Sequence, residues 1–148
     1  MIELSTTQAI DLAVPLIRAS MGDQLGDKAA GEWADSNVEH TQMWGYFHHN
    51  QLVGICAIGA EISPTKVWLG YLAVGSDKRR KGLGSKLLAY AEKQARRQGY
   101  AWMFVETYDG AVFHAANAFY AANGYKRIGE LAEYLDDGSD AIFYRKRL

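Results

Sequence analysis

Two glycines and three basic residues separate an apolar run from an amphipathic segment in the middle of the chain. Residues 66–74 (KVWLGYLAV) are apolar at both alternating positions, which predicts a strand covered on both faces. The basic loop is Arg79-Arg80-Lys81-Gly82-Leu83-Gly84. Apolar residues then recur at helical spacing, at Leu83, Leu87, Leu88, Ala91 and Ala95. With Gly99 as the stop signal, the sequence predicts a strand, a glycine-rich basic loop and a helix in direct succession.

The loop has the features of an anion site. A helix start offers unpaired N–H groups and a partial positive charge, and glycine lets an anion approach the main chain. An ordinary strand-to-helix turn with solvated charges is the alternative, but three adjacent cations favour a phosphate. A Walker loop needs a lysine directly after its second glycine, but Ser85 follows Gly84, so a nucleotide triphosphatase is disfavoured. A dinucleotide fingerprint needs a third small residue three positions after Gly84, where this chain has Leu87.

Two segments carry a resemblance to a known family. The pattern Arg79-x-x-Gly82-x-Gly84, after a strand ending Leu72-Ala73-Val74, resembles the coenzyme A loop of the GNAT N-acetyltransferase superfamily. The segment 117–125 (NAFYAANGY) resembles the second signature of that family, a short helix ending in a glycine and an aromatic residue. The resemblance covers roughly residues 66–128. It implies acetyl-CoA as co-substrate and an acyltransferase activity.

The order of predicted elements agrees with the fold that this resemblance implies. Strands are predicted at Met1–Leu4, Met43–His48, Leu52–Glu61, Lys66–Val74, Ala101–Thr107, Tyr125–Glu133 and Ala141–Arg147. Helices are predicted at Thr7–Met21, Lys28–Asn37, from the loop glycines to Gln98, and at Val112–Asn123, with Gly124 as a left-handed cap. The implied class is α/β (α+β): a mixed, mostly antiparallel sheet of about six or seven strands, splayed in its middle and flanked by about four helices.

Composition and charge set looser limits. A chain of 148 residues with 49% hydrophobic content is expected to form one domain over residues 1–148. Residues 76–97 carry eight basic against two acidic side chains, while residues 1–65 carry eight acidic against two basic ones. Coenzyme A explains the basic block through its pyrophosphate and 3′-phosphate. A nucleic-acid patch is disfavoured because Tyr90 is the only aromatic there. The acidic half suits a cationic substrate.

Other features argue against further partners. The first residues lack the basic start of a signal peptide and no run is long enough to span a membrane, so a cytoplasmic protein without a membrane partner is expected. Cys56 lies in an apolar run and is expected to be a packed thiol. No metal is expected, because His48 and His49 should point to opposite faces of a strand, and His40 and His114 lack paired-ligand spacing. The sequence leaves open whether the protein forms a homodimer.

The resemblance also implies roles for individual residues. In such proteins the strand before the loop carries a bulge whose N–H groups face the pantetheine, here Leu72–Val74, with the Leu72 N–H as oxyanion donor. Gly70 would ease that distortion, or would simply let Trp68 or Trp102 pack closely. The expected coenzyme-binding residues are Leu72, Ala73, Val74, Arg79, Arg80, Lys81, Gly82, Leu83, Gly84, Ser85, Asn117 and Tyr120.

Acetyl transfer to an amine also needs a proton donor and a proton acceptor. Tyr120 matches the general-acid tyrosine of the family and is expected to protonate the thiolate, with Asn117 on the same helix face holding the pantetheine arm. Both could instead belong to an ordinary buried stripe. Glu106 is the expected base, because it is the only charge in its strand and lies near the expected divergence. Glu39, Glu61 and Asp109 are the alternatives, and a solvated edge residue is the alternative role for Glu106.

The acceptor pocket is expected from the second helix, the Trp44–Phe47 strand and the loop Tyr134–Asp140. Trp33, Trp44 and Tyr46 would form its apolar wall, unless they are simply core, and Glu39 and Asp137 would steer a cation. The expected function is direct transfer of acetyl from acetyl-CoA to a primary amine of a small molecule. A protein lysine or N-terminal amine, a non-catalytic acyl-CoA-binding module and a nucleic-acid-binding domain are the alternatives.

Overall fold

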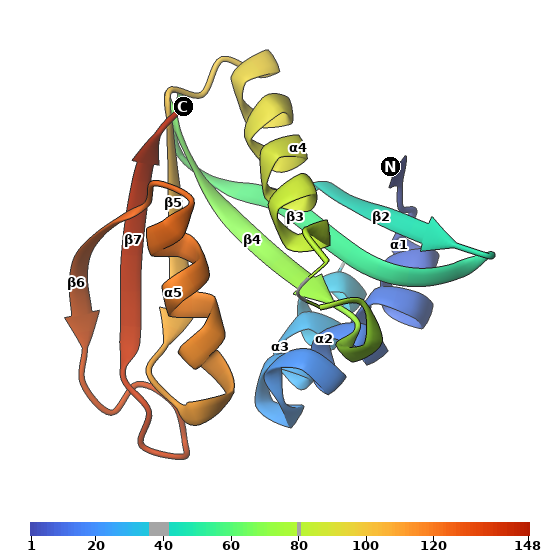
Figure 1. Cartoon of the computed structure of the whole chain (residues 1–148), viewed down its shortest axis with the longest axis horizontal. Coiled ribbons are helices and arrows are strands. Elements are labelled where there is room, and N and C mark those ends of the chain that lie inside the picture. Colours follow the sequence, from blue (N-terminus) through green and yellow to red (C-terminus); the bar gives the residue numbers. More distant parts are fainter. Residues whose placement is uncertain (36–41, 80) are drawn as a thin grey trace.

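The computed structural model describes residues 1–35, 42–79 and 81–148 of the chain. Within this part, seven strands form one mixed sheet in the order β1-β2-β3-β4-β5-β7-β6 (Figure 1). The strands are β1 (Ile2–Glu3), β2 (Gln42–His48), β3 (Gln51–Ser63), β4 (Lys66–Val74), β5 (Trp102–Tyr108), β6 (Lys126–Leu131) and β7 (Ala141–Arg147). The pairing of β4 with β5 is parallel and the other pairings are antiparallel, so the predicted sheet is confirmed.

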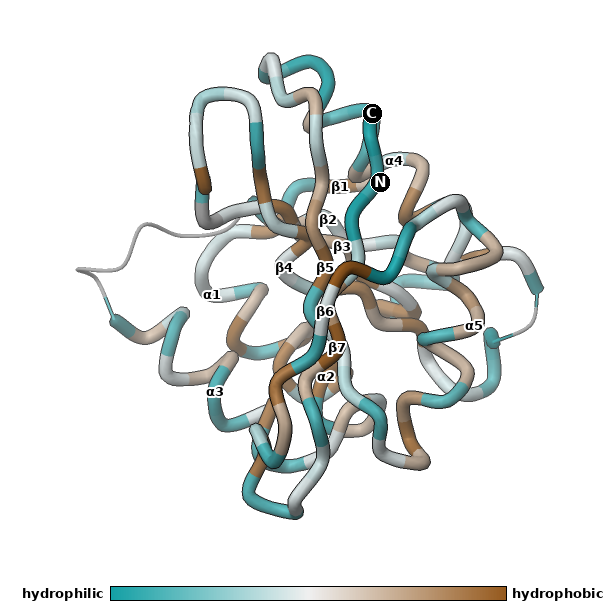
Figure 2. The backbone as a smooth tube through the Cα atoms, turned by 90° about the vertical axis from the view of Figure 1, so that its left-hand side faces the viewer, coloured by the Kyte–Doolittle hydropathy of each residue, from teal (hydrophilic) through white to brown (hydrophobic). Residues whose placement is uncertain are grey.

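Helices cover both faces of the sheet. They are α1 (Thr6–Gln8), α2 (Val14–Met21), α3 (Asp23–Ala34), α4 (Leu83–Arg97) and α5 (His114–Ala122). Figure 2 shows α1 and α3 on one side of the strands and α4 and α5 on the other, and Figure 1 places α2 beside α3. Among the described helices, none is long and apolar enough to cross a membrane.

The first predicted helix is interrupted by a π-helical turn at Ala9–Ala13 that joins α1 to α2. Pro15 is the physical reason: it has no N–H to donate to the carbonyl four residues earlier, and its ring crowds that carbonyl. The chain widens instead, and the Val14 N–H donates to the carbonyl of Ala9, five residues back. The predicted continuous helix is therefore one helical path with a local change of pitch.

The second predicted helix begins earlier than expected, at Asp23 rather than Lys28. Gly22 adopts a φ of 93°, which ends α2 and allows the next helix to start at once. Arg18 of α2 then pairs with Asp27, at 2.7 Å between Nη1 and Oδ1, and fixes the corner. The predicted end at Asn37 lies outside the described residues.

The β2–β3 hairpin turns as predicted, but its two histidines do not point apart. His48 ends β2, while His49 and Asn50 both take positive φ values, of 50° and 61°. This left-handed pair is the turn conformation that matches strand twist, and it removes His49 from the strand alternation. The two imidazole rings therefore lie 4.2 Å apart, centroid to centroid.

The sheet opens where β4 and β5 part. Their parallel pairing runs from Lys66 opposite Trp102 to Leu69 opposite Val105, and no further pairing between them is present in the described chain. Figure 1 shows the two strands diverging from there. On its other edge, β4 has one extra residue at the same point: Ala57 of β3 pairs with Tyr71 and Ile58 pairs with Leu69, so Gly70 is a β-bulge.

The bulge exchanges the faces of β4. Before it, Val67 and Leu69 belong to the core under α4; after it, Leu72 contacts that core, although simple alternation would have put Tyr71 there. Tyr71 instead packs with the core on the α2–α3 side, together with Ala73. The strand distortion is therefore at Gly70 itself, whereas Leu72–Val74, where the bulge was expected, pair regularly with Cys56, Ile55 and Gly54 of β3. The bulge decides which side chains face each half of the fork.

One acidic side chain of α4 is buried. Glu92 is 6% exposed. Its Oε1 accepts hydrogen bonds from the Lys146 ammonium at 2.8 Å and from the Tyr125 hydroxyl at 3.1 Å. These partners supply the pairing that a buried carboxylate needs. Glu92 therefore connects α4 to β7 and to the residue before β6.

Candidate active site

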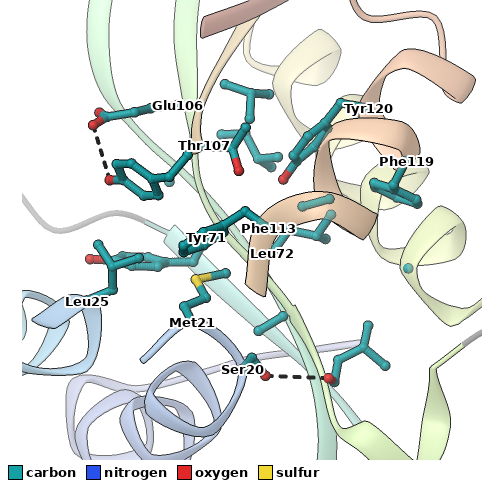
Figure 3. A pocket seen from close by; sticks show the side chains of 18 of the residues that line it. Ser20, Met21, Leu25, Tyr71, Leu72, Glu106, Thr107, Phe113, Phe119 and Tyr120 are labelled. Atoms are coloured by element: carbon teal, nitrogen blue, oxygen red, sulfur yellow. Dashed lines mark hydrogen bonds between the residues drawn. The ribbon is translucent and has the colours of Figure 1, made fainter. Parts of the chain in front are cut away.

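A cavity of about 770 Å³ occupies the fork between β4 and β5. One wall comes from α2 and α3, the opposite wall from α5, and one end from the loop before α4 (Figure 3). Nine predicted site residues line it: Leu72, Ala73, Val74, Arg79, Gly82, Gly84, Ser85, Glu106 and Tyr120. Residues that the sequence assigned separately to coenzyme and chemistry therefore share one continuous space.

The loop end of the cavity is the start of α4. Gly82 is the N-cap with a φ of 77°, a left-handed conformation that glycine adopts without strain. The first intrahelical bond runs from the Lys86 N–H to the Gly82 carbonyl, so the N–H groups of Leu83, Gly84 and Ser85 precede the helical ladder. Arg79 lines the same end and anchors its Nε on the Val74 carbonyl at 3.3 Å. Unpaired donors and a cation thus face the cavity at one place, which fits a diphosphate.

Among the described residues, the predicted coenzyme residues that do not line this cavity are Lys81, Leu83 and Asn117. The side chain of Leu83 is buried in the core under α4, so any contact it makes with the coenzyme comes from its backbone. Lys81 lines a second cavity of about 310 Å³, together with Lys78 and Lys86. Arg80 lies outside the described residues.

Tyr120 projects from α5 into the fork and is 7% exposed. Its ring packs against Phe119, Tyr125 and Tyr144, with centroid distances of 5.4, 5.7 and 6.0 Å. Its hydroxyl makes no hydrogen bond with any residue that the structure describes. Burial raises the pKa of Tyr120, so the phenol keeps its proton well into the alkaline range.

Asn117 is used inside the protein. Its Nδ2 donates to the carbonyls of Tyr108 at 2.8 Å and Phe113 at 3.0 Å, and its Oδ1 accepts from the Tyr144 hydroxyl at 2.9 Å. Both hydrogens of Nδ2 are used, so a hydrogen bond to a pantetheine arm would have to use the second lone pair of Oδ1. Asn117 thus holds α5 against β5 and β7, and the pantetheine contact that the resemblance implies stays a prediction.

Glu106 directly follows Val105, the last residue of β5 that pairs with β4, as expected for a residue at the divergence of these two strands. It lines the cavity, and its Oε1 accepts a hydrogen bond from the Tyr108 hydroxyl at 3.1 Å. The alternative bases lie elsewhere: Glu61 accepts from Tyr100, and Asp109 accepts from the backbone of Asp140. Glu39 falls outside the described residues.

The acceptor wall differs from the prediction. Trp33 and Trp44 are 5% exposed and belong to the two cores, while Tyr46 lines the second cavity, so these aromatics form no wall here. The predicted steering residue Asp137 caps its own loop by accepting from the Ser139 N–H. The predicted second helix does contribute to the cavity, through Lys28 and Glu32, although neither was singled out. The other lining residues that sequence reasoning missed are Ser20, Met21, Leu25, Tyr71, Thr107, Tyr108 and Phe113.

Among the missed residues, Glu32 and Tyr71 form a pair. The Tyr71 hydroxyl donates to Glu32 Oε2 at 2.5 Å, which joins α3 to β4 just after the bulge. Burial is the main cause that raises the pKa of Tyr71, and the hydrogen bond and charge of Glu32 add to it. The helical spacing of α3 did not single out Glu32, and Tyr71 faces it only because of the bulge at Gly70.

Thr107 is a second missed polar residue. It is 4% exposed and lines the cavity from β5, and no described residue gives its hydroxyl a hydrogen bond. In Figure 3, Thr107 and Tyr120 reach the cavity from β5 and α5. The Thr107 hydroxyl is not among the buried side-chain atoms of the described residues that lack a hydrogen bond, so it is open to the cavity, where it can donate to or accept from a bound group.

Comparison with known proteins agrees with this site. The family model described as acetyltransferase (GNAT) domain matches residues 39–127, which include the loop, the fork and α5. The chain therefore belongs to the GNAT acetyltransferases. It is an N-acetyltransferase, and acetyl-CoA is its co-substrate. Comparison with curated proteins finds no significant match.

Solved structures share the whole fold at low identity. A protein solved as a candidate GNAT acetyltransferase from Desulfovibrio desulfuricans is 20% identical, with a TM-score of 0.83 over 98% of this chain and 96% of that chain. Aminoglycoside 6′-acetyltransferase type Ii is 25% identical, with a TM-score of 0.78 over 98% and 94%. An aminoglycoside 6′-N-acetyltransferase complexed with coenzyme A is 21% identical, with a TM-score of 0.75 over 93% and 89%. Within the described residues, no group of His, Cys, Asp or Glu could hold a metal ion.

Proposed function

We propose that this protein transfers the acetyl group of acetyl-CoA directly to a primary amine of a small molecule. The observation that carries the proposal is the single cavity in which the helix start, Glu106 and Tyr120 meet at the fork. Its volume of about 770 Å³ suits a small ligand beside a coenzyme arm. The similarity to aminoglycoside acetyltransferases, which act on small molecules, supports the same acceptor class.

The two substrates would enter from opposite faces of the sheet. Thr107 shares its strand parity with Met103 and Val105, which pack under α4, and Tyr120 reaches the fork from α5. This side contains the phosphate loop, so it would hold the coenzyme. Tyr108 shares the parity of Glu106 and packs with Leu25 of α3. The α2–α3 side would therefore hold the acceptor, with the reacting atoms meeting between β4 and β5.

Glu106 would prepare the amine. An alkylammonium has a pKa near 10.4 and has no lone pair while it is protonated. The Glu106 carboxylate lies at the fork and uses one oxygen for Tyr108, which leaves its other oxygen able to accept the ammonium proton directly or through a water. The sheet pairing with β7 continues through Glu106 opposite Phe143, so the carboxylate is carried on a rigid strand.

The backbone of β4 and the phenol of Tyr120 would stabilise the charges that develop. Beyond Leu69 no described strand pairs with the fork edge of β4, and we assign the Leu72 N–H in this stretch to the carbonyl oxygen of the thioester. Tyr120 would hydrogen-bond the leaving sulfur. Its raised pKa does not prevent this, because burial also raises that of a thiol: in this protein, burial raises the pKa of Cys56 to about 12.

The proposed reaction is balanced by these residues. A carbon–nitrogen bond forms as the carbon–sulfur bond breaks. The ammonium loses two protons on the way to the amide: Glu106 takes the first before attack, and the second, lost after the new bond forms, restores the proton that Tyr120 gives to the thiolate. Glu106 then releases its proton to solvent. The products are an N-acetylated amine and the free thiol of coenzyme A. A cytoplasmic setting, where acetyl-CoA is supplied, is part of the same proposal.

The test is release of thiol from acetyl-CoA with a panel of small amines and with lysine-containing peptides, checked by the mass of the N-acetylated product. We expect turnover with small amines and a large loss in the Glu106→Gln variant, with unchanged coenzyme affinity by calorimetry. Turnover confined to peptides would refute the small-molecule acceptor. Full activity of Glu106→Gln would refute Glu106 as the base.

A further inference from the structure

The acceptor side of the cavity contains a second carboxylate besides the proposed base. Four charged residues among those described line the cavity: Lys28, Glu32, Arg79 and Glu106. Arg79 belongs to the coenzyme loop. The α3 side of the fork therefore presents two carboxylates and one ammonium, and one of the carboxylates, Glu32, has no part in the chemistry described above.

Glu32 is held in place from within the cavity. Its Oε2 accepts the hydrogen bond from Tyr71, whereas its Oε1 is 3.9 Å from the Lys28 ammonium, too long for a hydrogen bond. The side chains of Lys28 and Glu32 are 50% and 39% exposed, so their ion pair is weak. A positively charged group bound in the cavity could therefore take the place of Lys28 at Glu32 Oε1.

Glu32 and Glu106 lie close enough to act on the same two phenols. The charge of Glu106 raises the pKa of Tyr71, which is bonded to Glu32, and the charge of Glu32 raises the pKa of Tyr108, which is bonded to Glu106. All four residues also line the same cavity, so the two carboxylate–tyrosine pairs face one region of the fork.

We propose that Glu32, positioned by Tyr71, binds a second cationic nitrogen of the acceptor, so that the preferred substrate is a compact molecule with two amino groups. One nitrogen lies at Glu106 and reacts, while the other stays protonated at Glu32. This inference rests on the proposed function for its reacting amine. It makes Glu32 a residue that selects the substrate and assigns it no part in proton transfer.

The experiment compares 1,4-diaminobutane with butylamine, which differ only in the second amino group. Binding to the protein saturated with coenzyme A is measured by calorimetry, and turnover is measured by thiol release. Wild type is expected to bind the diamine at least fivefold more tightly than the monoamine. Glu32→Gln, which keeps the size of the side chain, should remove this preference and leave the affinity for butylamine unchanged.

Two further variants should change the affinity for the diamine in opposite directions. Lys28→Ala should strengthen diamine binding, because it removes the competing cation, and Tyr71→Phe should weaken it by less than Glu32→Gln does. A wild type without preference for the diamine, or a Glu32→Gln variant that keeps the preference, would overturn the subsite. A diamine preference that depends on Glu32 but comes without acetyl transfer would support the subsite and refute the proposed function.

Discussion

Replacement of Tyr120 by phenylalanine separates chemistry from stability. The hydroxyl makes no hydrogen bond with the described residues, so its removal takes away no protein–protein bond, while the ring contacts with Phe119, Tyr125 and Tyr144 stay. The free energy of unfolding should therefore change by less than about 1 kcal/mol, or a Tm shift of about 2–4 °C at most in a domain of this size. Turnover should fall roughly a hundredfold or more, as expected when a general acid is lost.

Tyr125→Phe is the matched control, since it removes the same atom from a neighbouring buried ring. The Tyr125 hydroxyl donates to the buried Glu92, and its loss leaves that carboxylate with one partner fewer. We expect a destabilisation of about 1–3 kcal/mol, which lowers the Tm by roughly 2–10 °C. Because Tyr125 does not line the cavity, the turnover of the folded variant should stay close to wild type.

Turnover by thiol release and Tm by calorimetry should be measured on the same preparations. Tyr120→Phe should lose turnover and keep its Tm, whereas Tyr125→Phe should lose Tm and keep its turnover. Coenzyme affinity should remain unchanged in both. The reasoning fails if Tyr120→Phe keeps full turnover, because the phenol then donates to nothing in the reaction. It also fails if Tyr120→Phe loses as much stability as Tyr125→Phe, because the hydroxyl then has a structural partner.

The remaining predictions concern the loop, the fork and alkaline pH. In Gly84→Ala the new Cβ would lie 3.4 Å from the Phe119 ring, an ordinary contact, so little stability should be lost. The same Cβ would hinder the approach of the coenzyme phosphates to the main chain, so calorimetry should show weaker coenzyme binding. Gly82→Ala meets no atom within 4 Å but has a φ of 77°, so it should lose about 1–2 kcal/mol of stability; equal stability of the two variants would contradict this. Thr107→Val should raise the Tm but weaken ligand binding, with Thr107→Ser restoring binding, whereas a lower Tm in Thr107→Val would indicate a structural hydroxyl. Burial raises the pKa of Tyr120 and Tyr125 above the unfolded value of about 10, so native phenols keep protons that the unfolded chain releases. Stability is therefore fully present below pH 10 and should decline above it, by about 1.4 kcal/mol per pH unit for each tyrosine, and a flat profile by denaturant unfolding would contradict the burial argument.

Local patterns predicted the strand, the glycine-rich loop and the helix at the basic end of the cavity. The apolar run, the glycines and the helical spacing after them are short-range features, and each acts on the backbone within a few residues. The strand β4, the left-handed Gly82 and the open start of α4 therefore agree with the sequence prediction. The position of Glu106 was also predicted, because the single charge in this otherwise apolar strand lies where β5 parts from β4; its role as the base stays a prediction.

The acceptor end could not be predicted in the same way. Aromatic residues near an expected pocket are read equally well as wall or core, and Trp33 and Trp44 are core because helices and strands distant in sequence close over them. Asn117 was assigned to the coenzyme by position on a helix face, but three partners from β5, the turn before α5, and β7 occupy its amide. Such contacts depend on the packing of whole elements.

The sequence by itself determined the elements, their order and the phosphate loop, because hydrophobic periodicity and glycine conformation act locally. The tertiary structure decided which side chains meet in the fork. One extra residue at Gly70 reverses the alternation of β4. This reversal turns Tyr71 towards Glu32 and Leu72 towards the α4 core. That reversal depends on the register against β3, which is fixed only when the two strands pair.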